Sequence, residues 1–138
     1  MAAKYVLDAC ALFAFIYKEP GFDVVKSILK QTNADSAEVF MNKLNLFEVF
    51  YGIRRAESLQ AAESVYGTIV KLPIQIINGI SDDVFLEASR IKASYRMSLA
   101  DSITLGEASM MGASLITADH HELDVVEQNE GISFTWIR

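Results

Sequence analysis

Short runs of apolar, β-favouring residues alternate with longer amphipathic segments along the chain. This alternation is typical of a parallel sheet with helices on its faces, because parallel strands are joined by helical crossovers. We expect strands at 5–7, 39–41, 74–77, 114–117 and 133–136. We expect helices at 9–17, 22–31, 44–54, 59–70, 82–95, 99–111 and 122–129. The pattern therefore predicts an α/β fold.

The size and composition favour one compact domain over residues 1–138. A chain of 138 residues can bury a sizeable core without metal or disulfide support, and 51% of its residues are hydrophobic. Its single cysteine, Cys10, allows no internal disulfide, which fits a reducing compartment. The N-terminal apolar run is too short for a signal peptide, and no stretch approaches the length of a bilayer span. We therefore expect a cytoplasmic protein that does not cross a membrane.

The formal net charge of -6 argues against a protein that binds nucleic acid by simple charge attraction, since such binding relies on Lys and Arg. It does not exclude an enzyme that acts on nucleic acid. If several acidic residues gather around a metal ion, the ion offsets part of their charge.

Four acidic residues stand in apolar surroundings, and they are the strongest functional signal in the sequence. They are Asp8, Glu48, Asp101 and Asp119. A carboxylate among apolar residues loses part of its hydration, so it usually becomes protonated or finds a cation. A cluster that holds a divalent metal ion would explain all four together.

Helix capping is the competing explanation for three of these acids. Asp8 and Asp119 each follow an expected strand and precede an expected helix, where Asp is a common N-cap. Glu122 follows Asp119 by three residues as in a capping box, and Ser98 stands three residues before Asp101. Taken singly, each acid is more often a cap than a catalyst. However, the loops that follow parallel strands line the edge where ligands bind, so caps at that edge can also belong to a site.

Glu48 has no capping role, because it lies in the middle of an expected helix. Its helical neighbours include Leu44 and Tyr51, so it is expected on the face that packs against the core. No Lys or Arg lies three or four residues away on this helix. The alternative to a functional role is a salt bridge with a cation from another part of the fold.

The strings YVLDACALFAF, NLFEVFYGI and SLADSITLGEASMMGASLITAD carry the four acids in an order that resembles the PIN-domain ribonucleases, and among them the VapC-type toxins of toxin–antitoxin pairs. The resemblance implies a PIN-like three-layer α/β/α domain over 1–138 with a five-stranded parallel sheet. It also implies a metal site made of these carboxylates and endoribonuclease activity. The family usually has Thr or Ser after the first Asp, where this chain has Ala9, so one hydrogen bond that orients Asp8 is expected to be missing.

Oxygen ligands without a cysteine cluster favour Mg²⁺ or Mn²⁺ over zinc. We predict that Asp8, Asp101 and Asp119 hold the metal and that Glu48 positions or deprotonates the attacking water. All four are therefore candidate catalytic residues for cleavage of RNA phosphodiesters. Thr117, two residues before Asp119, is a candidate supporting residue that could hold a water molecule of the metal site.

Two other functions stay open at this point. One is a non-catalytic PIN-fold module that only binds a partner, and the other is a metal-dependent nuclease or phosphatase that acts on another substrate. The resemblance implies three partners, which are an RNA substrate, a small antitoxin protein and a second copy of the chain. Aromatic residues on two expected helices fit such interfaces; they are Phe13, Phe15, Phe47, Phe50 and Tyr51.

Two further groups lie close to the acids in the sequence. The segment 90–96 contains three basic residues and a tyrosine, and it could contact RNA phosphates, although a solvated helix face explains it more simply. His120 and His121 are adjacent at an expected helix start and point in different directions, so we interpret both as solvated surface rather than as metal ligands.

Overall fold

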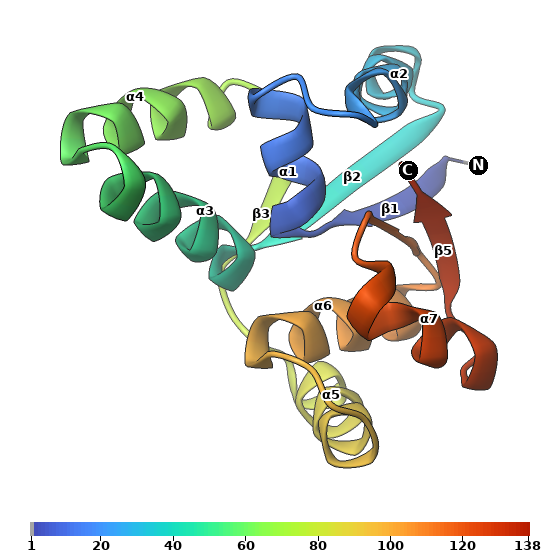
Figure 1. Cartoon of the computed structure of the whole chain (residues 1–138). Coiled ribbons are helices and arrows are strands. Elements are labelled where there is room, and N and C mark those ends of the chain that lie inside the picture. Colours follow the sequence, from blue (N-terminus) through green and yellow to red (C-terminus); the bar gives the residue numbers. More distant parts are fainter. Residues whose placement is uncertain (1) are drawn as a thin grey trace.

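The computed structural model describes residues 2–138 and has the predicted α/β fold (Figure 1). Five parallel strands form one sheet in the order β3-β2-β1-β4-β5. They are β1 Ala3–Leu7, β2 Ala37–Asn42, β3 Gln75–Ile77, β4 Ser114–Thr117 and β5 Ser133–Trp136. The helices are α1 Ala9–Ile16, α2 Phe22–Gln31, α3 Lys43–Ala56, α4 Leu59–Ile69, α5 Asp82–Ser94, α6 Leu99–Met111 and α7 His120–Asn129, with a short 3₁₀ helix, η1 Thr32–Ala34.

Helices cover both faces of the sheet, which gives the expected three layers. Figure 1 shows α1 to α4 on one side of the sheet and α5 to α7 on the other. Neighbouring strand residues point to opposite faces. Leu7 and Ile116 therefore join the core under α1 to α4, whereas Val6 and Leu115 join the core under α5 to α7. Burial on both faces explains why these strands are continuous apolar runs.

The predicted elements are confirmed, with small shifts at their ends. β1 begins two residues earlier than expected, and α7 begins at His120 rather than at 122 because Asp119 caps it. The 3₁₀ helix η1 was not expected, since it merely extends α2 by one tighter turn. Within residues 2–138, no helix is long and apolar enough to span a bilayer.

The strand order reverses direction at β1, between β2 and β4. β1 pairs with β2 on one side and with β4 on the other, so the chain leaves β1 in one direction and later returns to its opposite edge. In open parallel sheets this reversal point is where ligands bind. Asp8 directly follows β1, and Asp119 follows β4 by two residues. The topology therefore brings two of the predicted site residues to one place.

Close packing of α5 against α6 positions the start of α6. Gly106 makes this contact, because an added Cβ there would lie 3.0 Å from the Cβ of Ala88 and 3.2 Å from the backbone oxygen of Val84. A side chain at this position would require the neighbouring atoms to shift, so glycine suits this close approach. The first turn of α6, which carries Asp101, is held in place by this packing.

Two buried polar contacts also tie α6 to the rest of the fold. Asn45 on α3 donates to the hydroxyl of Thr104, and Asn42 at the end of β2 donates to Glu107 Oε2 at 2.9 Å. Glu107 is only 2% exposed, and within the described chain its Oε1 has no hydrogen-bond partner. Burial raises the pKa of Glu107, although the bond from Asn42 opposes this rise.

Candidate metal centre

Asp8 is buried at the start of α1 and acts as its N-cap. Its Oδ1 accepts the backbone N–H of Ala11 at 2.8 Å, and the residue is only 3% exposed. Burial raises the pKa of Asp8 to about 6 from an ordinary value of 3.8. The hydrogen bonds with Thr117 and Ala11 oppose this rise, whereas the negative charges of Asp119 and Glu48 add to it. The expected cap is therefore real, and other carboxylates lie near it.

Thr117 links the ends of β1 and β4. Its buried hydroxyl accepts the backbone N–H of Asp119 at 3.1 Å and also forms a hydrogen bond with the carboxylate of Asp8. Ala9 offers no such bond, so the orientation of Asp8 depends on a neighbouring strand instead. Thr117 therefore acts on the Asp8 carboxylate, whereas Ala9 has no hydroxyl to do so.

Asp101 lies in the first turn of α6, where Ser98 is the N-cap. The hydroxyl of Ser98 accepts the backbone N–H of Asp101 at 3.1 Å, as the sequence predicts. The pKa of Asp101 is raised to about 7, chiefly by burial and also by a hydrogen bond with Glu122 and the charges of Asp8 and Asp119. With a pKa near 7, this carboxyl group changes its protonation near neutral pH, and a nearby cation would shift that change.

Asp119 and Glu122 bring a second helix start to the same place. Asp119 caps α7, and its Oδ1 accepts the backbone N–H of Glu122 at 3.3 Å. One carboxylate oxygen each from Asp101, Asp119 and Glu122 lie within 4.8 Å of one another. In the sequence Glu122 is explained by the capping box alone, and that pattern gives no sign that its side chain lies near Asp101.

Glu48 is half-buried on α3 rather than fully inside the core. Burial and the negative charge of Glu122 raise its pKa. None of the ion pairs within residues 2–138 involves Glu48. The salt bridge that would have explained it as a purely structural residue is therefore absent from the described chain.

The four predicted acids lie in one region, but they do not all belong to its tightest group. Asp101 and Asp119 form that group together with Glu122. Asp8 lies near enough to raise the pKa of Asp101, and Glu48 lies near enough to raise the pKa of Asp8. Two full charges about 5 Å apart repel each other by about 3 kcal/mol at an effective dielectric of 20. A site of oxygen donors with this much negative charge fits Mg²⁺ or Mn²⁺.

Two of the three basic residues in segment 90–96 make contacts within the protein. Arg90 pairs with Glu87 at 2.9 Å and with Glu130 at 2.8 Å, and Lys92 donates to the backbone oxygen of Met97. These contacts support the structural interpretation of this segment rather than a role in RNA binding.

The family is decided by comparison with known sequences. The chain matches the family model of the PIN domain over residues 5–128. This chain belongs to the PIN-domain family. Among curated proteins, by contrast, no sequence gives a significant match.

Solved structures of PIN-domain proteins share the fold at low sequence identity. A DNA-bound VapBC complex from Salmonella typhimurium gives a TM-score of 0.71 at 17% identity, with 99% of each chain covered. VapBC2 from Rickettsia felis, bound to a DNA fragment from its promoter, gives 0.71 at 12% identity and covers 96% of this chain and 97% of that one. VapC20 from Mycobacterium tuberculosis, described as a toxin that cleaves the sarcin-ricin loop, gives 0.61 at 14% identity, covering 91% and 95%.

The metal-free protein should lose stability as the pH rises from about 4 to about 7. In this range the folded state holds protons on Asp8 and Asp101, whose pKa values are about 6 and 7, whereas the unfolded chain releases them near 3.8. The folded state binds more protons, so the free energy of unfolding falls as the pH rises. Melting temperatures measured in EDTA across this range test the expectation.

The matched controls are Asp101→Asn, which removes one of these protonation sites, and Glu63→Gln, which neutralises an exposed carboxylate on α4. Asp101→Asn should flatten the pH dependence, and Glu63→Gln should leave it unchanged. Excess Mn²⁺ should restore stability at about pH 7.5 in the wild type, since an ion bound at 100 times its Kd stabilises by about 2.7 kcal/mol. Identical pH profiles for wild type and Asp101→Asn would contradict the account.

Proposed function

We propose that this chain is a metal-dependent endoribonuclease that cleaves RNA phosphodiester bonds in the cytoplasm and serves as the toxin of a toxin–antitoxin pair. The observation that carries this proposal is the meeting of Asp101, Asp119 and Glu122 beside Asp8 and Glu48 in a PIN-family chain. The toxins and toxin–antitoxin complexes among the similar structures support the biological role.

Each carboxylate has a part in the proposed reaction. Asp8, Asp101 and Asp119 would hold Mg²⁺ or Mn²⁺, and the position of Glu122 adds it to this set. The metal, when bound, stabilises the charge that grows on the phosphoryl oxygens during attack by water. Glu48 positions or deprotonates that water, and its raised pKa suits a general base.

Cleavage assays on structured RNA with single-stranded loops test the proposal. Asp101→Asn and Asp119→Asn should each lower the cleavage rate by about 100-fold or more, and the double variant should lose little beyond either single one, because the residues act as a unit. Glu48→Gln should lower the rate to a similar degree without lowering the melting temperature. It removes a half-buried charge that has no ion-pair partner among residues 2–138.

Glu63→Gln is the matched control and should cut at the wild-type rate. Cleavage that survives both EDTA and Asp101→Asn would overturn the proposed site. A folded protein that binds its partner but cuts neither RNA, DNA nor a simple phosphate ester would instead support the non-catalytic module. Metal-dependent cleavage of DNA or a phosphate ester, but not of RNA, would support the other enzymatic alternative.

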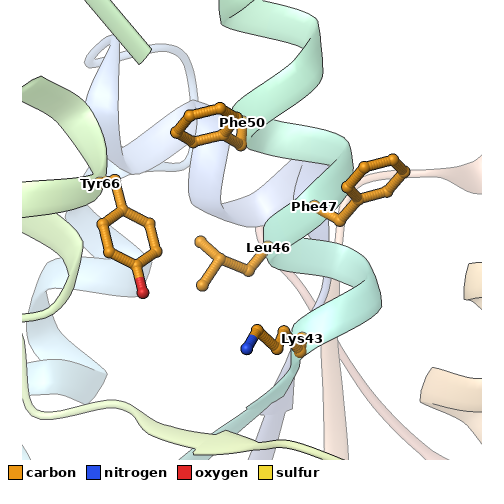
Figure 2. Close-up of a pocket in the computed structure, with 5 residues that line it drawn as sticks. All are labelled: Lys43, Leu46, Phe47, Phe50 and Tyr66. Carbon is orange, nitrogen blue, oxygen red and sulfur yellow. The ribbon is translucent and has the colours of Figure 1, made fainter. Parts of the chain in front are cut away.

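A groove between α3 and α4 is the proposed binding place for the antitoxin. Its volume is about 220 Å³, and the residues that line it are Lys43, Leu46, Phe47, Phe50 and Tyr66. Figure 2 shows Leu46 and Phe50 of α3 pointing toward Tyr66 of α4, while Phe47 points to another side of α3. An amphipathic segment could place its apolar side here.

A second copy of the chain is the other proposed partner. Phe47 is 60% exposed, and Tyr51 next to it on the same helix is also exposed. Phe13, Phe15 and Phe50 instead pack against the core, so only part of the predicted aromatic surface is free for a homodimer interface.

The groove is tested by measuring binding of the candidate antitoxin. This is the small protein that an adjacent upstream reading frame would encode. Tyr66→Ala should weaken that complex by about tenfold, because a large exposed ring is lost from the contact. Leu86→Ala, which removes an even more exposed apolar side chain on α5, should not. Equal affinities for both variants would remove the groove from the proposal, and a monomer at micromolar concentration in sedimentation would remove the homodimer.

A further inference from the structure

A cavity of about 440 Å³ lies where the end of β3 and the loop after it meet α5 and α6. This volume is within the range of small-molecule binding sites. Its walls are mostly apolar, and the side chains that line it are those of Ile77, Ile80, Ser81, Val84, Glu107 and Met111. Glu107 is the one charged residue among those of the described chain that line it. The cavity is therefore an apolar space with a single carboxyl group in its wall.

Only one of the two carboxyl oxygens of Glu107 has a partner, although the residue is just 2% exposed. Its Oε2 accepts the side-chain N–H of Asn42 at 2.9 Å, whereas its Oε1 has no hydrogen-bond partner among residues 2–138. None of the ion pairs in that range involves Glu107. A buried carboxyl oxygen without a donor costs free energy, and burial accordingly raises the pKa of Glu107. A donor that reached Oε1 from the cavity would remove this cost.

This carboxyl group is separate from the candidate metal centre. Glu107 follows Asp101 by six residues on α6, which is about 9 Å along the helix axis at about 1.5 Å per residue. Within the described chain, the pKa of Glu107 responds to burial and to Asn42, and to none of the carboxylates of the metal centre. The nearest charges in the sequence of α5 are also negative, since Asp82 and Asp83 directly follow Ser81 in its first turn. The surroundings therefore favour a positively charged ligand.

The lining of the cavity suits an organic cation better than a metal ion. Mg²⁺ and Ca²⁺ surround themselves with several oxygen ligands, and this cavity offers one carboxyl group among apolar walls. An ammonium or guanidinium group, by contrast, forms a strong charge-assisted hydrogen bond with a single carboxylate. The apolar walls would then cover the stem that carries the charged group.

We propose that this cavity binds a small organic cation, whose ammonium or guanidinium group donates to Oε1 of Glu107 while its apolar stem packs against Ile77, Ile80 and Val84. The site is independent of the proposed nuclease function. The cation is either a free small molecule or a Lys or Arg side chain of a partner protein, since both carry the same groups. Binding also acts on α3, because Asn42 caps this helix by accepting the backbone N–H of Leu44 at 2.9 Å.

The probe is n-butylammonium, and n-butanol is its uncharged match in size. Both are titrated into the wild-type protein at about pH 7.5, where the amine is protonated, and binding is followed by the methyl NMR signals of Ile77, Ile80 and Met111. The ammonium should shift these signals and bind about tenfold more tightly than the alcohol, because a charge-assisted hydrogen bond adds to the same apolar contact. Equal affinities for the two probes, or shifts confined to other parts of the protein, would overturn the inference.

Two variants separate the charged contact from the apolar one. Glu107→Gln keeps an oxygen for Asn42 and should weaken n-butylammonium binding by about tenfold while leaving n-butanol binding unchanged. Ile80→Ala changes a side chain that is 45% exposed and should weaken both probes alike, because it removes only apolar wall. Glu63→Gln is the matched control on α4 and should bind both probes like the wild type. A folded Glu107→Gln that binds the ammonium with wild-type affinity would contradict the proposed site.

The candidate antitoxin distinguishes the two sources of the cation. If it displaces n-butylammonium from the wild type, and Glu107→Gln weakens its own binding by about tenfold, the source is a Lys or Arg side chain of the partner. If n-butylammonium still binds to the complex with unchanged affinity, the source is a free small molecule. Neither measurement involves RNA cleavage, so a failure of the proposed function leaves this test intact.

Discussion

The carboxylates at the ends of β1 and β4 repel one another, and the fold has to hold them together against this repulsion. Three of them stand at helix starts, because Asp8 caps α1, Asp101 lies in the first turn of α6 and Asp119 caps α7. Helix N-termini carry a partial positive charge and free N–H groups that donate hydrogen bonds to a carboxylate. The capping role and the site role of these residues therefore support each other.

The helix starts offset only part of the negative charge. Burial is the main cause of the raised pKa values of Asp8 and Asp101, and the charges of neighbouring carboxylates add to it. Rigid surroundings keep the groups close in spite of their repulsion. Thr117 joins the ends of two strands, and Gly106 lets α5 hold α6 at short range. A cation that enters this region would meet ligands that are already in place, which lowers the cost of ordering them on binding.

The fold could be predicted from the sequence because each strand and α-helix has a recognisable local pattern of apolar and polar residues. The acids were found because Asp8, Glu48, Asp101 and Asp119 break apolar runs. Local pattern could not reveal contacts between distant elements. Glu122 had a sufficient explanation as part of a capping box, so nothing pointed to its place beside Asp101. The stack of His120 on Trp136 joins α7 to β5, and in the sequence His120 resembled a solvated residue.

The central claim is that these carboxylates form a metal site that gives up protons when it is filled. Calorimetric titration of Mn²⁺ into the metal-free protein at about pH 6.5, in two buffers with different ionisation enthalpies, tests it most directly. Metal binding requires deprotonated ligands, and the pKa values of Asp8 and Asp101 are about 6 and 7. The account predicts saturable binding with net proton release that is reduced in Asp101→Asn. Absence of binding heat, or binding without proton release, would contradict it.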